Sequence, residues 1–66
     1  MTPQELLLKA SQSVNFAMNL QAENLKSDSR YAMQQAKDFI EAVRKYISGE
    51  ISDLEIWYLD YMENRK

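Results

Sequence analysis

The fold is decided by residues 46–56, which read YISGEISDLEI. Gly49 is the only glycine in the chain, and it follows the last apolar pair of a long helical pattern. Glycine often takes the left-handed conformation just after a helix C-terminus. Arg44 and Lys45, in the last turn before it, suit the negative end of the helix dipole. We therefore predict a helix over 29–48 that this glycine ends.

The next residues carry the signals of a new helix N-terminus. Ser52 and Glu55 have the spacing of a capping box, in which each side chain bonds the backbone N–H of the other residue. Ile51 and Ile56 have the spacing of a hydrophobic staple across the same turn. Both signals predict a short third helix over 53–64.

The start of the chain shows the same kind of N-terminal signal. Thr2 can cap a helix, Pro3 suits the first helical position and Glu5 completes a capping box. Apolar residues then recur at the spacing of one helical face. They are Leu6, Leu7, Ala10, Val14, Ala17, Met18 and Leu25. This pattern predicts an amphipathic helix over 3–26.

The boundary between the first two helices carries no glycine or proline. Residues 26–29 read KSDS, and serine and aspartate favour helix ends because their side chains hydrogen-bond nearby backbone groups. We predict the break there, so that 3–26 and 29–48 form a helical hairpin. The apolar residues on both sides of the break have nearly the same helical phase, so one uninterrupted helix over 3–47 is the alternative.

The chain is short for independent stability. In 66 residues, the free energy gained by burying apolar surface roughly cancels the entropy lost on ordering the chain. Small domains usually add disulfides, a metal or a partner chain, and this sequence has no cysteine and no histidine. We therefore predict one small all-α domain over 1–66, a helical hairpin plus a short third helix. It is expected to associate as a dimeric helical bundle or with another protein.

The composition excludes most catalytic chemistry. Without cysteine or histidine there is no thiol nucleophile, no imidazole base and no common zinc ligand. Carboxylate pairs such as Asp53 with Glu55 fit helix caps and solvated positions, because three short helices enclose no pocket that would raise a carboxyl pKa. We predict no enzyme activity, no cofactor and no metal.

Charge and hydropathy restrict the partners. A net charge of −2 disfavours nucleic acid, whose phosphates attract basic proteins. No apolar run approaches the roughly 18 residues of a membrane span, and no basic leader precedes an apolar segment. We predict a cytoplasmic protein with no membrane partner.

The third helix is apolar nearly all round, which is typical of a helix that bridges two surfaces. One of its faces carries Leu54, Trp57, Tyr58 and Tyr61. Phe16 and Leu20 form a second patch, opposite the main apolar face of the first helix. Because tryptophan and tyrosine are enriched at interface hot spots, we predict that these six residues bind a partner or a second copy. The alternative for the aromatic face is that it closes the core of a three-helix domain, and the alternative for Phe16 and Leu20 is that the third helix packs on them.

The charges are segregated along the chain. The last third is acidic and includes Asp60 and Glu63, whereas Arg30, Lys37 and Arg44 follow one stripe of the middle helix. We predict that these five residues steer the encounter with a partner. The alternative is an ordinary solvated surface.

These features predict a non-catalytic regulatory or adaptor protein, such as an inhibitor, an antagonist or a chaperone-like protein. It would act by protein–protein binding through its aromatic, acidic C-terminal helix. The alternative is a helix-turn-helix-like DNA-binding regulator that uses the 29–45 helix.

Overall fold

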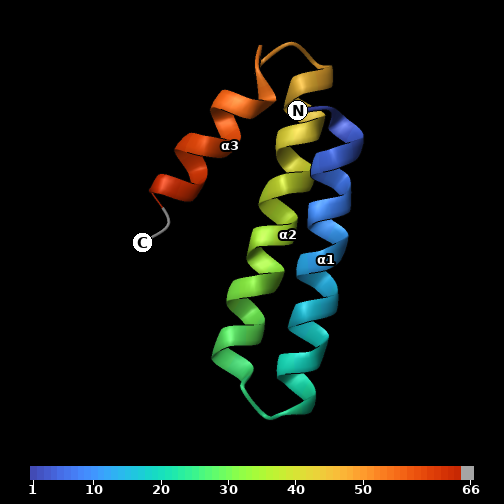
Figure 1. The fold of residues 1–66 in the computed structure, drawn as a ribbon, viewed down its shortest axis with the longest axis vertical. Coiled ribbons are helices and arrows are strands. Elements are labelled where there is room, and N and C mark those ends of the chain that lie inside the picture. The colour runs from blue at the N-terminus through green and yellow to red at the C-terminus, as the bar shows by residue number, and fades with distance from the viewer. Residues whose placement is uncertain (65–66) are drawn as a thin grey trace.

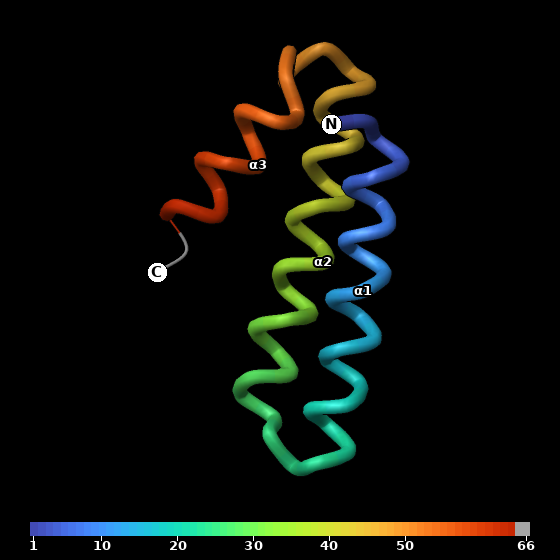
Figure 2. Tube along the Cα trace, in the orientation of Figure 1, coloured from blue at the N-terminus to red at the C-terminus, as the bar shows by residue number. Residues whose placement is uncertain are grey.

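The computed structural model describes residues 1–64 as three helices, α1 (Pro3–Ala22), α2 (Lys26–Ile47) and α3 (Leu54–Glu63). This confirms the predicted all-α class. Figures 1 and 2 show α1 and α2 side by side and antiparallel, with α3 starting beside the open end of this hairpin and leaning away from α2. None of the three helices is both long and apolar enough to cross a membrane.

The start of α1 follows the sequence prediction. Thr2 is the N-cap, and its Oγ1 accepts a hydrogen bond of 3.1 Å from the backbone N–H of Glu5. The Thr2 hydroxyl also donates to Oε1 of Glu5 at 3.4 Å. Pro3 stands at the first helical position, where its missing N–H costs no hydrogen bond.

The break between α1 and α2 lies three residues earlier than predicted. Asn24 takes the left-handed conformation with φ of 65°, and its N–H donates to the carbonyl of Gln21 at 3.0 Å. The N–H of Leu25 donates to the carbonyl of Leu20 at 2.9 Å, which completes a Schellman motif. The predictions of a first helix to residue 26 and of one helix over 3–47 are both wrong, because asparagine tolerates this conformation better than most residues.

Residues 26–29 belong to α2, so the predicted start at residue 29 is also wrong. Ser29 does not cap the helix. Its Oγ is turned into the hairpin and donates a 2.9 Å hydrogen bond to the carbonyl oxygen of Ala17 on α1. Ser29 is buried, and this bond fixes how α1 and α2 are aligned.

The end of α2 is the turn that Gly49 predicts. Gly49 has φ of 88°, and its N–H donates to the carbonyl of Tyr46 at 3.2 Å. The N–H of Glu50 donates to the carbonyl of Lys45 at 2.8 Å. These two bonds form a second Schellman motif. The helix ends at Ile47, one residue before the predicted boundary.

The cap of α3 is Asp53, and the predicted capping box at Ser52 is wrong. Oδ1 of Asp53 accepts hydrogen bonds from the N–H groups of Glu55 at 2.9 Å and Ile56 at 3.2 Å. A carboxylate satisfies two N–H groups and also suits the positive end of the helix dipole. Ile56 is exposed, so the predicted staple with Ile51 does not form. α3 is one residue shorter at each end than the predicted 53–64.

The core lies where the three helices meet, near the open end of the hairpin. Phe39 of α2, Leu6 of α1 and Leu54 of α3 are its largest fully buried side chains. Small residues fill most of the remaining core positions, which lets α1 and α2 approach closely. They are Ala10, Ala36, Ala42 and Val43.

Candidate protein-binding surfaces

The aromatic face of α3 packs on Phe39 within one chain. The Phe39 ring lies 6.2 Å from that of Trp57, 5.7 Å from that of Tyr58 and 5.6 Å from that of Tyr61, measured between centroids. Trp57 and Tyr61 also stack on each other at 5.0 Å. Leu54 is completely buried beneath them. These four residues thus close the core of a single chain, and their role in binding a partner stays a prediction.

Polar contacts to both arms of the hairpin help to hold α3 in this position. The Tyr61 hydroxyl donates a hydrogen bond to Oδ2 of Asp38 on α2. On the other side of α3, Nζ of Lys9 on α1 lies 5.2 Å from the centre of the Tyr58 ring, within the range of a cation–π contact. The helix is therefore tied to both arms of the hairpin.

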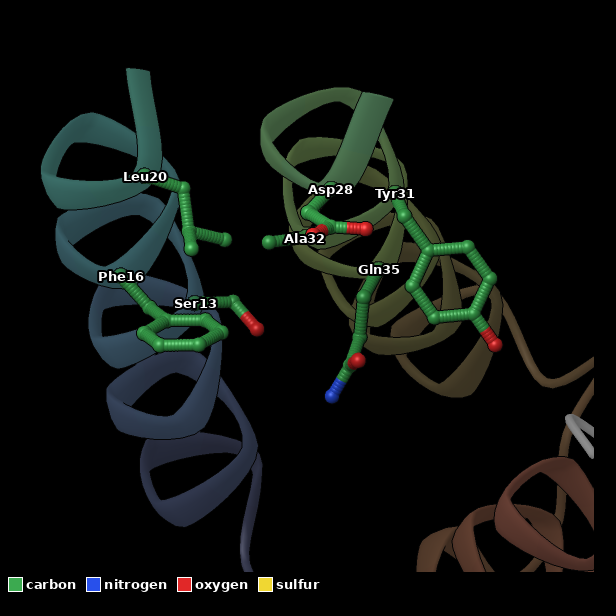
Figure 3. Close-up of a pocket in the computed structure, with 7 residues that line it drawn as sticks. All are labelled: Ser13, Phe16, Leu20, Asp28, Tyr31, Ala32 and Gln35. Atoms are coloured by element: carbon green, nitrogen blue, oxygen red, sulfur yellow. The ribbon is translucent and has the colours of Figure 1, made fainter. Parts of the chain in front are cut away.

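Phe16 and Leu20 are not covered by α3, so the alternative that the third helix packs on this patch is wrong. They line a cavity of about 440 Å³ between α1 and α2, together with residues of the facing helix. The full lining is Ser13, Phe16, Leu20, Asp28, Tyr31, Ala32 and Gln35. Figure 3 shows the side chains of Leu20 and Ala32 pointing toward each other between the helices, with Phe16 and Tyr31 on either side. We call this feature the front groove.

The front groove extends toward α3. A neighbouring cavity of about 230 Å³ shares Ser13, Phe16 and Gln35 with it and ends at Tyr58 and Lys9. Phe16 is 59% exposed and Tyr31 is 55% exposed, so two aromatic rings on facing helices border one open channel. Sequence reasoning missed Tyr31 because this residue lies off the apolar stripe of α2.

The outward face of α3 is both apolar and acidic. Ile56, Leu59 and Met62 are exposed there. The nearby carboxylates are those of Glu55, Asp60 and Glu63, all of them exposed. Asp60 is engaged locally, since its carbonyl and its Oδ1 accept hydrogen bonds of 2.9 and 3.1 Å from Nδ2 of Asn64.

The predicted steering cations lie along α2 and do not meet the acids of α3. Within residues 1–64, none of Arg30, Lys37 and Arg44 forms an ion pair with Asp60 or Glu63. Arg44 instead pairs with a neighbour on its own helix. Its Nη2 lies 2.9 Å from Oε1 of Glu41, and this hydrogen bond lowers the pKa of the Glu41 carboxyl and raises that of the guanidinium.

Neither a metal centre nor a known relative points to a function. Among residues 1–64, no three acidic side chains come together in a way that could hold a metal ion. Comparison of the chain with protein-family models, with curated proteins and with solved structures gives no match. The function has to be argued from the surfaces described above.

Proposed function

We propose that this chain is a non-catalytic regulatory or adaptor protein that binds another protein in its front groove. The observation that carries this proposal is the pair Phe16 and Tyr31, two exposed aromatic rings that border one cavity from facing helices. Large aromatic side chains are the usual anchors of protein interfaces, because they bury much area for little loss of entropy.

Burial of the two rings supplies part of the free energy of binding. An aromatic side chain buries about 150–250 Å² when it is fully covered. Covering the exposed half of each ring therefore gives about 2 kcal/mol per ring at 25 cal/mol per Å². Leu20 and Ala32 extend the apolar surface between the rings. The two rings together supply about 4 kcal/mol, which only matches the lower end of the roughly 4–15 kcal/mol that association costs, so the other contacts of the groove must supply the net affinity.

The shape of the groove fits an amphipathic helix of the partner. The groove runs along the seam between α1 and α2, and an apolar helical face seated in such a seam is a common mode of recognition. Asp28 stands at the loop end of the groove and Lys9 at its α3 end. The positive N-terminus of a bound helix is therefore favoured beside Asp28 and its negative C-terminus beside Lys9.

Capture from a lysate of the source organism, with matched variants, tests this proposal. The immobilised chain should retain a protein whose affinity falls at least tenfold with Phe16→Ala and with Tyr31→Ala. Leu8→Ala is the control, because Leu8 is as exposed as Phe16 but lies on α1 outside the groove. The Leu8→Ala variant should bind the captured protein with the same affinity as the unmodified chain.

Two results would contradict the proposal. Equal capture by the Phe16→Ala variant and by the unmodified chain would exclude the groove as the site. Retention of random duplex DNA that weakens with Arg30→Ala and falls steeply with salt would instead support the DNA-binding alternative. That alternative also requires a pair of helices at roughly 90–120°, whereas α1 and α2 lie side by side (Figure 1).

A further inference from the structure

The side of the hairpin opposite the front groove carries a second apolar surface, which we call the back face. At about 100° per residue, its members lie on the flank of each helix turned away from Phe16 and Tyr31. They are Leu7, Val14 and Met18 of α1 and Met33, Ile40 and Ile47 of α2. A cavity lined by Gln21 of α1 and by Lys26 and Arg30 of α2 shows that these two flanks adjoin.

Most of the back face is open to solvent. Leu7, Met18, Ile40 and Ile47 are exposed, the last of them to 77%. The whole chain exposes 4871 Å², whereas a folded monomer of this size exposes about 4,400 Å². The excess, together with an apolar strip that extends over both helices, indicates a surface that another chain covers.

We propose that the back face binds the back face of a second copy of this chain, with α1 of each copy against α2 of the other. The charges on the two flanks favour this pairing over one of α2 with α2. The α2 edge of the back face is basic, whereas the α1 edge is neutral. The first edge carries Lys26, Arg30, Lys37 and Arg44, and the second carries Gln4, Ser11 and Asn15. Pairing α2 with α2 would bring eight cations together, of which, within residues 1–64 of each copy, only the two Arg44 side chains are paired, with Glu41 of their own helix. Pairing α2 with α1 keeps the two basic edges apart.

The area of the back face matches what a dimer needs. α1 has 20 residues, which gives a length of about 30 Å, and two helices side by side are about 20 Å wide. The footprint of roughly 600 Å² approaches the ~800 Å² per partner of a standard interface. A second hairpin covers this width completely, whereas one helix covers half of it. The dimer is then a four-helix bundle, in which the two α3 helices and front grooves stay at the outside.

The alignment of the hairpin fixes which residues meet. The hydrogen bond between Ser29 and Ala17 places these two residues at the same height along the hairpin. Leu7 lies ten residues before Ala17 and Ile40 lies eleven after Ser29, so both stand at nearly the same height. A two-fold axis parallel to the helices keeps these heights and places Leu7 of each copy beside Ile40 of the other.

Sedimentation equilibrium tests whether the back face is the interface. The unmodified chain should be a dimer at micromolar concentration, and Ile40→Glu should raise its dissociation constant at least 100-fold. Leu59→Glu is the control, because Leu59 is similarly exposed but lies on the outward face of α3. A monomeric unmodified chain at ~100 μM would overturn the proposal. Dissociation by Leu59→Glu together with a dimeric Ile40→Glu variant would also overturn it, and would assign the contact to α3.

Disulfide trapping tests the arrangement of the two copies. The chain has no cysteine of its own, so Leu7→Cys and Ile40→Cys each introduce a single thiol. Oxidation of a mixture of the two variants should yield mainly the mixed disulfide, since the bond requires Cα atoms about 4.4–6.8 Å apart. A predominance of either homodisulfide would overturn the pairing of α1 with α2. Phe16→Ala should leave the dimer intact, so this inference and the proposed function fail separately.

Discussion

The Tyr61 hydroxyl donates a hydrogen bond of 2.5 Å to the Asp38 carboxylate, which lies 23 residues earlier in the chain. This bond is partly buried and joins α3 to the middle of α2. Oδ1 of Asp38 also accepts a bond of 3.0 Å from Nε2 of Gln34, so the carboxylate is held in place from its own helix. The position of α3 therefore depends on a polar contact as well as on the aromatic cluster.

We expect Tyr61→Phe to lower the free energy of unfolding by about 1 kcal/mol, because it removes this bond and keeps the ring. Urea denaturation at one fixed protein concentration measures the change. Tyr46→Phe is the matched control. Because Tyr46 is exposed, this variant should have the same free energy of unfolding as the unmodified chain. Equal effects of the two variants would show that the bond to Asp38 adds no stability.

Phe39 is the centre of the ring cluster, and Phe39→Leu should release α3 more readily than it unfolds the hairpin. The variant keeps apolar volume but loses three aromatic contacts, so we expect a destabilisation of about 2 kcal/mol. The fluorescence of Trp57, the only tryptophan, should shift to the red as its ring becomes solvated. Phe16→Leu replaces the other phenylalanine and should change neither quantity in the absence of a partner.

Ser29→Ala should cost about 1 kcal/mol, because it removes the one described side-chain bond between α1 and α2. The carbonyl of Ala17 keeps its partner within α1, so the loss stays moderate. Thermal unfolding followed by circular dichroism measures it. Ser27→Ala, at an exposed site on the same helix, should have a smaller effect. A stability gain with Ser29→Ala would mean that helix propensity outweighs the buried bond.

At the two left-handed residues, glycine should be tolerated and alanine should destabilise the fold. Asn24→Gly should be neutral or stabilising, whereas Asn24→Ala and Gly49→Ala should each cost about 1–2 kcal/mol. Apart from its chain neighbours, no residue has an atom within 4 Å of a Cβ added at Gly49, so the cost of the substitution is backbone strain. Denaturation curves of the three variants check this, and an unchanged Gly49→Ala variant would contradict it.

The Glu41 carboxyl should titrate below the ordinary pKa of glutamate, because its hydrogen bond with Arg44 favours the charged form. Its stabilising effect is present above the unfolded pKa and is lost as the pH falls through the lower folded pKa. Carbon NMR of the side chain should show the pKa rise with Arg44→Gln. Lys45→Gln should raise it less, since Lys45 acts through its charge without that bond. Equal shifts in both variants would contradict the role of the hydrogen bond.

The helices themselves were largely predictable, because helix signals act over a few residues. Gly49 ended α2 as expected, and Thr2 with Pro3 began α1 as expected. The errors came where two neighbouring residues could serve the same purpose. Asp53 replaced Ser52 as a cap, since a carboxylate can accept from two N–H groups. Asn24 ended α1 although the serines after it carried the more familiar signal.

The sequence by itself determined an all-α chain with three helices and with more apolar faces than one hairpin can bury. The tertiary structure decided which of those faces meet. The aromatic face of α3 could have packed on Phe16 or on Phe39, and the periodicity of α3 is identical in both cases. The turn at Gly49 starts α3 beside the open end of the hairpin, where Phe39 lies, so the rings gather there and the front groove at Phe16 stays open.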